Sequence, residues 1–209
     1  MYYWLGKHIE FPPHEVASEE GIIALGGDLS TERLIYAYKN GIFPWFNEGE
    51  PIVWYSPVER MVLFPEELKV SKSMRQVLRK NDFTITENKA FKDVILACKK
   101  IERKDQDGTW ITDDMLAAYT KLHDIGIAKS IEVWNKDELV GGLYGVDLHN
   151  GVFCGESMFS NVSNMSKVAF IYLAQQMSYK LIDCQVYNNH LASLGAREID
   201  RKNFLEYLK

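Results

Sequence analysis

The sequence has few cysteines and no long apolar run, and both shortages narrow the kind of protein that it encodes. It holds three cysteines, an odd number without Cys-x-x-Cys spacing, so reduced thiols in a cytosolic protein are expected rather than a disulfide framework. Its apolar runs fall far short of the roughly 20 residues that span a membrane. The N-terminus has no basic segment followed by an apolar one, so no signal peptide is expected.

The chain also lacks an excess of positive charge. Its formal net charge of -5 argues against a general nucleic-acid binder, although a local basic patch remains compatible with it. The five histidines show no metal-ligand spacing. With 46% apolar residues among 209, the chain is expected to build a real core, as one domain or as a large domain with a small one.

Hydrophobic patterning predicts a change of organisation near residue 62. The expected helices are 31–40, 71–80, 90–101, 113–124, 164–179, 188–194 and a last one ending at 208. The expected strands are 52–56, 61–64, 83–86, 128–134, 138–146, 152–154, 181–186 and 197–199. This order predicts an α+β fold, with a small N-terminal α/β domain at 1–62 and a second domain at 63–209.

Polar residues interrupt two apolar strands in the second half of the chain. The strand at 152–154 is expected to open into a Gly-Glu-Ser-Met-Phe-Ser turn at 155–160, before a helix. About 25 residues later, Asp183 and Gln185 interrupt a second apolar strand. A buried polar group without a partner costs roughly 1–3 kcal/mol. Two such places predict a polar active centre in a mostly apolar cleft.

Ordered motifs over nearly the whole chain point to one family. They are GGDLS (26–30), AYKNGIFPWF (37–46), PIVWYSP (51–57), GTWIT (108–112), SIEVWNKDELVGGLYGV (130–146), FCGESMFS (153–160), SK (166–167) and LIDCQVYNNHLASLGA (181–196). Through them the chain resembles the bacterial leucyl/phenylalanyl-tRNA–protein transferase family. Two places depart from the family pattern: residues 178–180 lack glycines, and Tyr55 stands where a second tryptophan is expected beside Trp54.

The resemblance implies an aminoacyltransferase. Such an enzyme moves Leu or Phe, with Met as a further candidate, from leucyl-tRNA or phenylalanyl-tRNA to a protein that begins with Arg or Lys. The product carries an N-degron that marks it for degradation. The implied architecture is a small N-terminal domain with an acyl-CoA N-acyltransferase-like (GNAT-like) C-terminal domain, in a cytoplasmic monomer without cofactor, metal or membrane contact.

The implied reaction is aminolysis of an ester, and Asp183 and Gln185 are the catalytic candidates. Residues i and i+2 of a strand share one face, so Asp183 is expected to orient the Gln185 amide. The amide oxygen would then accept a hydrogen bond from the attacking amine. The alternative is a structural hydrogen-bonded pair.

Glu156 is the candidate for binding the acceptor protein. An N-terminal Arg or Lys brings an α-amine and a basic side chain, and a carboxylate in the pocket would form charge-assisted hydrogen bonds with them. The alternative is a carboxylate that caps a turn.

Aromatic and apolar residues supply candidates for the aminoacyl and adenosine pocket. Tryptophans could stack on the terminal adenine, a contact worth about 1–3 kcal/mol per base. For each candidate, ordinary core packing is the alternative. The candidates are Trp45, Trp54, Trp110, Tyr119, Tyr144, Met158 and Phe170.

A basic helix is the candidate for contact with the tRNA acceptor stem. Lys72, Arg75 and Arg79 follow one another at spacings of three and four, which places them on one helix face, and Lys80 extends it. Such a face would bind phosphates without reading sequence. A solvated helix face is the alternative, and residues 99–104 form a second, weaker basic candidate.

Two other classes of function are compatible with parts of the sequence. An acyl-CoA-dependent N-acetyltransferase would need a glycine-rich loop for the pyrophosphate, and residues 155–166 contain one glycine. A non-catalytic adaptor for basic protein N-termini would need Glu156 and the apolar pocket, but not Asp183, Gln185 or the basic helix. Transfer of a labelled amino acid separates adaptor from enzyme.

Overall fold

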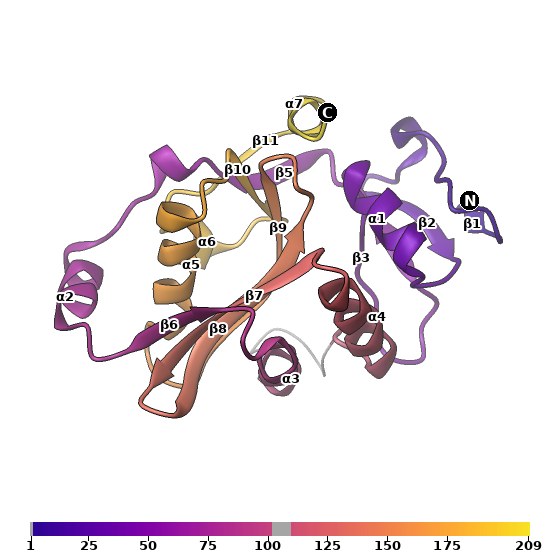
Figure 1. The fold of residues 1–209 in the computed structure, drawn as a ribbon. Helices are drawn as coiled ribbons and strands as arrows, with labels where there is room; N and C mark the ends of the chain where they lie inside the picture. Colours follow the sequence, from indigo (N-terminus) through magenta and orange to yellow (C-terminus); the bar gives the residue numbers. More distant parts are fainter. Residues whose placement is uncertain (1, 102–109) are drawn as a thin grey trace.

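The computed structural model describes residues 2–101 and 110–209. Among these residues the strands form a four-stranded and a seven-stranded sheet, with helices between and around them (Figure 1). The α+β class expected from the sequence is therefore confirmed.

The smaller sheet comes from the N-terminal segment and has the strand order β1-β2-β4-β3. Its strands are β1 (Trp4–Leu5), β2 (Ile22–Gly26), β3 (Phe43–Pro44) and β4 (Val53–Tyr55), with the 3-10 turn η1 (His14–Val16) and the helix α1 (Thr31–Lys39) between them. Trp54 is fully buried in this sheet. Its indole N–H donates to the Gly26 carbonyl at 2.9 Å.

The larger sheet carries the C-terminal strands and has the order β11-β5-β10-β9-β8-β7-β6. Its strands are β5 (Glu59–Leu63), β6 (Thr84–Glu87), β7 (Ala128–Asn135), β8 (Glu138–Asp147), β9 (Val152–Ser160), β10 (Leu181–Gln185) and β11 (Arg197–Asp200). Strands β6 to β9 pair antiparallel, whereas β9 and β10 pair parallel. A parallel pair requires a crossover, and the crossover here contains the helix α5.

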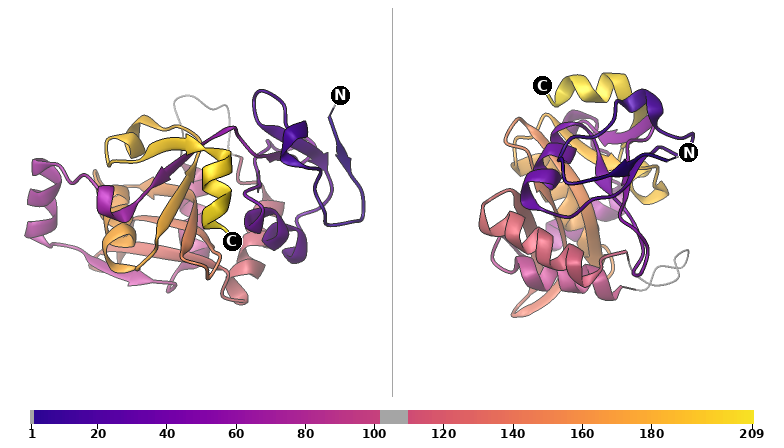
Figure 2. Two further views of the ribbon diagram at one scale, coloured as in Figure 1. Left: turned by 90° about the horizontal axis from the view of Figure 1, so that it is seen from above. Right: turned by 90° about the vertical axis from the view of Figure 1, so that its right-hand side faces the viewer.

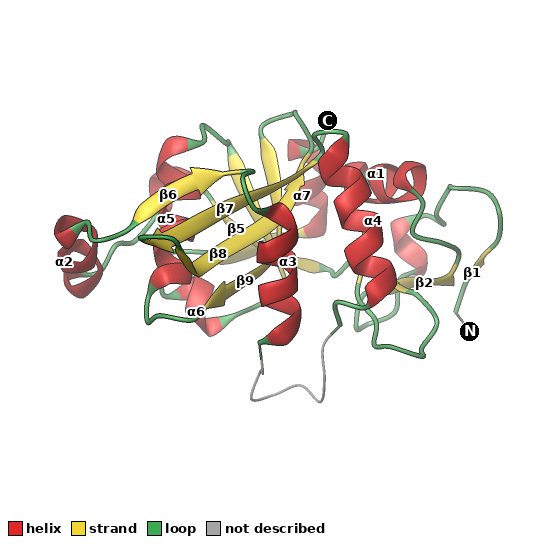
Figure 3. Ribbon diagram, turned by 60° about the horizontal axis from the view of Figure 1, so that its bottom comes forward, coloured by secondary structure: helices red, strands yellow, loops and turns green. Residues whose placement is uncertain are grey.

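Helices cover both faces of the larger sheet. They are α2 (Lys72–Lys80), α3 (Phe91–Lys100), α4 (Asp113–Asp124), α5 (Met165–Gln176), α6 (Asn189–Ala192) and α7 (Arg201–Tyr207), with the 3-10 turn η2 (Pro65–Glu67). Helix α3 lies across one face with α4 beside it, and α5 covers the other (Figure 3). Helix α2 and the N-terminal sheet lie at opposite ends of the molecule (Figure 2).

Local sequence signals explain where several helices begin and end. The Thr112 hydroxyl caps α4 by accepting from the Met115 N–H at 3.2 Å, and Ser71 caps α2 in the same way through Met74. The helix expected at 113–124 is confirmed with those bounds. Ser30 precedes α1 as expected, but its side chain makes no capping hydrogen bond.

One sequence-based expectation about the backbone is wrong. Residues 155–160 do not form a turn, because strand β9 continues to Ser160. Strand β8 supplies a partner for each residue of this stretch except Glu156, where the register shifts, with Tyr144 opposite Ser157 and Leu143 opposite Met158. Inter-strand hydrogen bonding therefore outweighs the polar composition that suggested a turn.

The core continues from the smaller sheet into the larger one. One cluster of buried residues joins Trp54, Phe43 and Tyr38 to Tyr119 of α4 and Tyr144 of β8, and a second lies beneath α5. Strand β5 already belongs to the larger sheet, and the expected domain boundary after residue 62 falls within it. The division into 1–62 and 63–209 stays a prediction. Within the described residues, no helix has the length and apolar character needed to cross a bilayer.

Candidate active site

A cavity of about 530 Å³ lies beside strands β9 and β10. Its walls come mainly from β8, β9, β10 and α5, with further contributions from Trp45, Trp110 and the segment that follows β10. The cavity brings together eight of the residues that the sequence singled out. They are Trp45, Trp110, Tyr144, Glu156, Met158, Phe170, Asp183 and Gln185.

Two predicted pocket residues do not line this cavity. Trp54 is in the core of the smaller sheet, where its indole N–H is already bonded to the backbone. Tyr119 is fully buried on α4, and its hydroxyl donates to Glu156 at 3.1 Å. Tyr119 therefore reaches the cavity through the Glu156 carboxylate.

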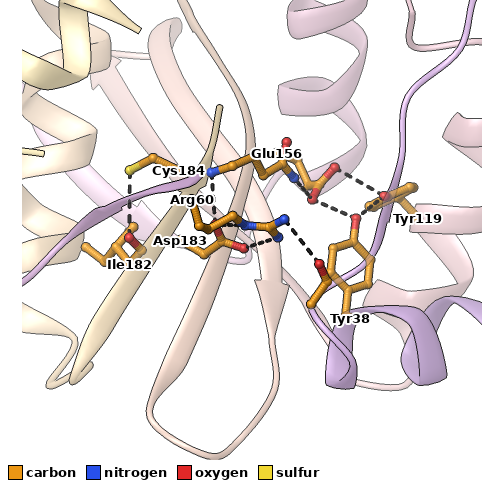
Figure 4. A network of polar contacts seen from close by, with 9 residues as sticks. Tyr38, Arg60, Tyr119, Glu156, Ile182, Asp183 and Cys184 are labelled. Atoms are coloured by element: carbon orange, nitrogen blue, oxygen red, sulfur yellow. Dashed lines mark hydrogen bonds and ion pairs between the residues drawn. The ribbon is translucent and has the colours of Figure 1, made fainter. Parts of the chain in front are cut away.

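The Asp183 carboxylate is held by an arginine that the sequence analysis had not singled out. Arg60 on β5 donates from Nε and Nη2 to the two oxygens of Asp183, at 2.7 and 2.6 Å (Figure 4). Both side chains are buried. A bidentate arginine–carboxylate pair fixes geometry as well as charge.

Gln185 stands at an irregularity in strand β10. The pairing of β10 with β5 shifts register between Asp183 and Gln185, and Gln185 has a φ of 64°. A left-handed backbone at a residue other than glycine costs of order 1–3 kcal/mol. Asp183 offsets part of that cost, because its Oδ1 accepts the Gln185 backbone N–H at 2.9 Å.

The expected contact between Asp183 and the Gln185 side chain is therefore wrong in detail. Asp183 holds the Gln185 backbone, whereas the Gln185 amide donates from Nε2 to Glu156 Oε1 at 2.8 Å. The shared-face argument assumed a regular strand, and the register shift removes that assumption. When Glu156 is ionised, the amide oxygen is left as the acceptor, since the reverse orientation would set it against a carboxylate.

Glu156 also accepts from two tyrosines on different helices. The Tyr38 hydroxyl of α1 lies 2.6 Å from Oε1 and the Tyr119 hydroxyl of α4 lies 3.1 Å from Oε2. The two hydroxyls also contact each other. Three oxygen contacts need three hydrogens, and the tyrosines supply two. All three are hydrogen bonds at once when Glu156 carries a proton.

The pKa of Glu156 agrees with this count. Burial raises that pKa from 4.5 to about 7, a direction that the charge of Asp183 adds to and that the two tyrosine hydroxyls and Arg60 oppose. Burial also holds the pKa values of Tyr38 and Tyr119 well above 10. Glu156 is thus the group in this network that changes charge near neutral pH.

The predicted basic residues lie outside the cavity. Lys72, Arg75, Arg79 and Lys80 are all exposed on α2. In the second basic candidate, residues 103 and 104 lie outside the described residues.

Two site residues, Arg60 and Tyr38, were missed by sequence reasoning. Their contacts with the site span 123 and 118 positions of the chain, which no local pattern reveals. Arg60 did leave a signal, because a charged residue directly precedes the apolar run Met-Val-Leu-Phe. Such a charge in a buried strand needs a partner.

A mixed α and β fold with an apolar cavity and a buried carboxyl of shifted pKa is typical of an enzyme. The sequence model of the leucyl/phenylalanyl-tRNA protein transferase family matches residues 62–209, and that of its N-terminal domain matches residues 27–58. The chain is 61% identical to the leucyl/phenylalanyl-tRNA–protein transferase of Flavobacterium johnsoniae and 57% identical to that of Flavobacterium psychrophilum, over 99% of each chain. It therefore belongs to this family of aminoacyltransferases, as its motifs predicted.

Solved structures match less closely. A functionally unknown conserved protein from Staphylococcus epidermidis has a TM-score of 0.46 and 9% identity, over 86% of this chain and 68% of that chain. So weak a likeness adds nothing to the family assignment.

Proposed function

We propose that this enzyme moves Leu or Phe from aminoacyl-tRNA to the N-terminal Arg or Lys of acceptor proteins, with Met as a further donor. The observation that carries the proposal is the Gln185–Glu156 pair in a mostly apolar cavity. The cavity suits an apolar aminoacyl side chain, and the pair offers an amide oxygen and a carboxyl group to an incoming amine.

The reaction is aminolysis of the ester that joins the amino acid to the tRNA ribose. The neutral α-amine of the acceptor attacks the ester carbonyl, the new C–N bond forms and the C–O bond to the ribose breaks. The amine loses one proton, and the departing ribose oxygen gains one. An α-amine has a pKa near 8, so about a tenth of it is neutral at pH 7.

Gln185 orients the attacking amine in this proposal. Its Nε2 donates to Glu156, so its Oε1 accepts a hydrogen bond from the amine. An amide oxygen is too weak a base to take the proton outright, so its contribution is orientation and charge stabilisation. Asp183 acts through the Gln185 backbone and does not touch the substrate.

Glu156 binds the cationic end of the acceptor. Three donors already reach its two oxygens, and an ionised carboxylate has about four acceptor positions. One position therefore remains for the positive charge of an N-terminal Arg or Lys. Tyr38 and Tyr119 hold the carboxylate for this contact.

The donor occupies the apolar part of the cavity. Met158, Phe170 and Tyr144 surround the Leu or Phe side chain, since a methionine adapts to either shape. Trp45 and Trp110 stack on the terminal adenine. The tRNA acceptor stem lies along α2, whose basic side chains are exposed. Trp54 has no part in this proposal.

The wider biological setting belongs to the same proposal. Strands β9 and β10, joined through α5 beside the cavity, are compatible with a GNAT-like catalytic domain behind a small N-terminal one. The enzyme would act as a cytoplasmic monomer without a cofactor, and its products would carry an N-degron.

Transfer of radiolabelled leucine from leucyl-tRNA tests the function directly. Two acceptor proteins that differ only in an N-terminal Arg or Ala are compared. Labelling of the Arg protein alone, with no added ATP, is the expected result. A folded enzyme that binds basic N-termini and labels neither protein would contradict the proposal and favour the adaptor.

A further inference from the structure

Arg60 is held in place on every side of its guanidinium group. The plane lies between the Phe43 and Phe204 rings, at 4.6 and 4.7 Å from their centroids. Its Nη1 donates to the Gly41 carbonyl at 3.2 Å, just beyond the end of α1. Two separate segments of the chain, at 41–43 and at Phe204, therefore fix the arginine before Asp183 is considered.

The Asp183 carboxylate accepts hydrogen bonds from Arg60 and from the Gln185 backbone. Arg60 donates to both oxygens, and the Gln185 N–H donates to Oδ1. Asp183 is fully buried, so it acts on the reaction through these partners. Of the two partners, Gln185 is the one whose side chain faces the cavity.

The direction of the Gln185 side chain depends on its backbone. In a regular strand, residue 185 would project on the same face as Asp183. The register shift and the φ of 64° turn it away, toward Glu156 on β9. The Asp183–Gln185 backbone bond is made in this left-handed conformation. If the Asp183 carboxylate moved, it would no longer hold the Gln185 backbone in the conformation that directs the Gln185 amide toward Glu156.

We propose that Arg60 is a positioning residue for aminoacyl transfer, because it fixes Asp183, which in turn fixes the backbone that aims Gln185. This inference rests on the proposed role of the Gln185 amide. An arginine does this better than a lysine, since a planar fork sets two distances and an orientation, whereas an ammonium acts as a point charge.

The same chain contains a matched comparison. Arg33 is also buried and also bonds an aspartate, Asp28, but its other partners are the Gly6 and His8 carbonyls. Neither Arg33 nor Asp28 lines the cavity. Replacing Arg33 by lysine removes a buried arginine fork at a place that contacts neither Asp183 nor Gln185.

The test is a double-mutant cycle on turnover. We expect Arg60→Lys to lower kcat by about tenfold or more while both Michaelis constants change by less than about twofold, because the amide is used in the transition state. In a Gln185→Ala background, Arg60→Lys should lower kcat no further. Arg33→Lys should keep normal kcat per folded molecule, judged by circular dichroism and thermal unfolding.

A second variant separates loss of activity from loss of folding. The pair Arg60→Met and Asp183→Leu removes both buried charges together, which proteins tolerate better than the loss of one. It should unfold at a temperature near that of the wild type and still lose kcat. A normal kcat in this folded variant, or a loss from Arg60→Lys that adds fully to Gln185→Ala, would overturn the inference. Normal turnover of Gln185→Ala alone would remove the amide's role and this inference with it.

Discussion

Gln185 meets two separate requirements, one on its backbone and one on its amide. The backbone must adopt a φ of 64° beside Asp183, and the amide must donate to Glu156 to leave its oxygen for the substrate. Glu156 in turn accepts from two tyrosine hydroxyls, and when Glu156 is ionised their two hydrogens leave none for the contact between the tyrosines. The protonation state of the site therefore depends on the number of available hydrogen-bond donors as well as on charge.

The amide of Gln185 is tested by its removal. Gln185→Ala should lower kcat by at least about tenfold in a folded protein, because orientation of the amine is lost. Single-turnover transfer from leucyl-tRNA measures it. Gln175→Ala, on the exposed end of α5, serves as the control and should leave the rate unchanged. Equal rates in the two variants would remove Gln185 from the mechanism.

The charge of Glu156 is tested by pH. With a pKa of about 7, the carboxyl is ionised above that pH and then binds a cation. The kcat/KM for an Arg acceptor should therefore rise as pH increases through 7. In Glu156→Gln this rise should vanish and the acceptor Michaelis constant should increase more than that for tRNA. The rise near pH 8 from the acceptor amine should remain. A variant whose profile matches the wild type would exclude Glu156 from acceptor binding.

At the scale of elements, α2 stands apart from the rest of the site. It is at the end of the molecule opposite the N-terminal sheet (Figure 2), and it buries little beyond Met74. Its basic residues do not contact the cavity. The proposed role of α2 in tRNA binding is compatible with its place outside the cavity.

Charge reversal on α2 should weaken tRNA binding. Replacing Lys72, Arg75 and Arg79 by glutamate should raise the Kd by about tenfold or more and flatten its salt dependence. Transfer from leucyl-adenosine, which has no acceptor stem, should be unaffected. The control reverses three exposed lysines elsewhere, Lys7, Lys136 and Lys202, for the same change in net charge. Equal affinities of the two triple variants would sink the proposal.

Elements defined by local signals were predictable from the sequence. The capped helix α4 and the β7–β8 hairpin follow from side chains close together in the chain. Strand β9 was predicted too short, because the polar composition of residues 155–160 suggested a turn, whereas pairing with β8 extends the strand. The residue types of the site were predictable, but their hydrogen-bond partners were not. Asp183, Gln185 and Glu156 interrupt apolar strands, whereas Arg60 and Tyr38 become relevant only once the chain has folded.

At the scale of the whole molecule, one core cluster joins the two sheets. Glu156 lies where this core meets the cavity, with tyrosines from α1 and α4 on it. Ionisation of Glu156 is therefore expected to change the free energy of unfolding of the whole protein.

The contribution of Glu156 to global stability should decline as pH rises toward neutrality. The folded pKa of Glu156, about 7, exceeds its unfolded value of 4.5, so the folded state binds more protons between these values. Its contribution is fully present below pH 4.5 and is lost as pH increases through 7. Urea unfolding across this range should show a shallower decline in Glu156→Gln. An identical slope in both proteins would contradict the raised pKa.

The Tyr38 hydroxyl has a consequence for gene exchange between relatives. It comes from the N-terminal segment, yet it bonds a carboxylate in the larger sheet. Consider a chimera that takes residues 1–58 from another member of the family. If that segment lacked a tyrosine at position 38, Glu156 would lose this hydrogen bond. Such a hybrid could fold and bind tRNA yet transfer slowly. In such a chimera, the hydroxyl oxygen at position 38 would matter as much as the fit between the exchanged surfaces.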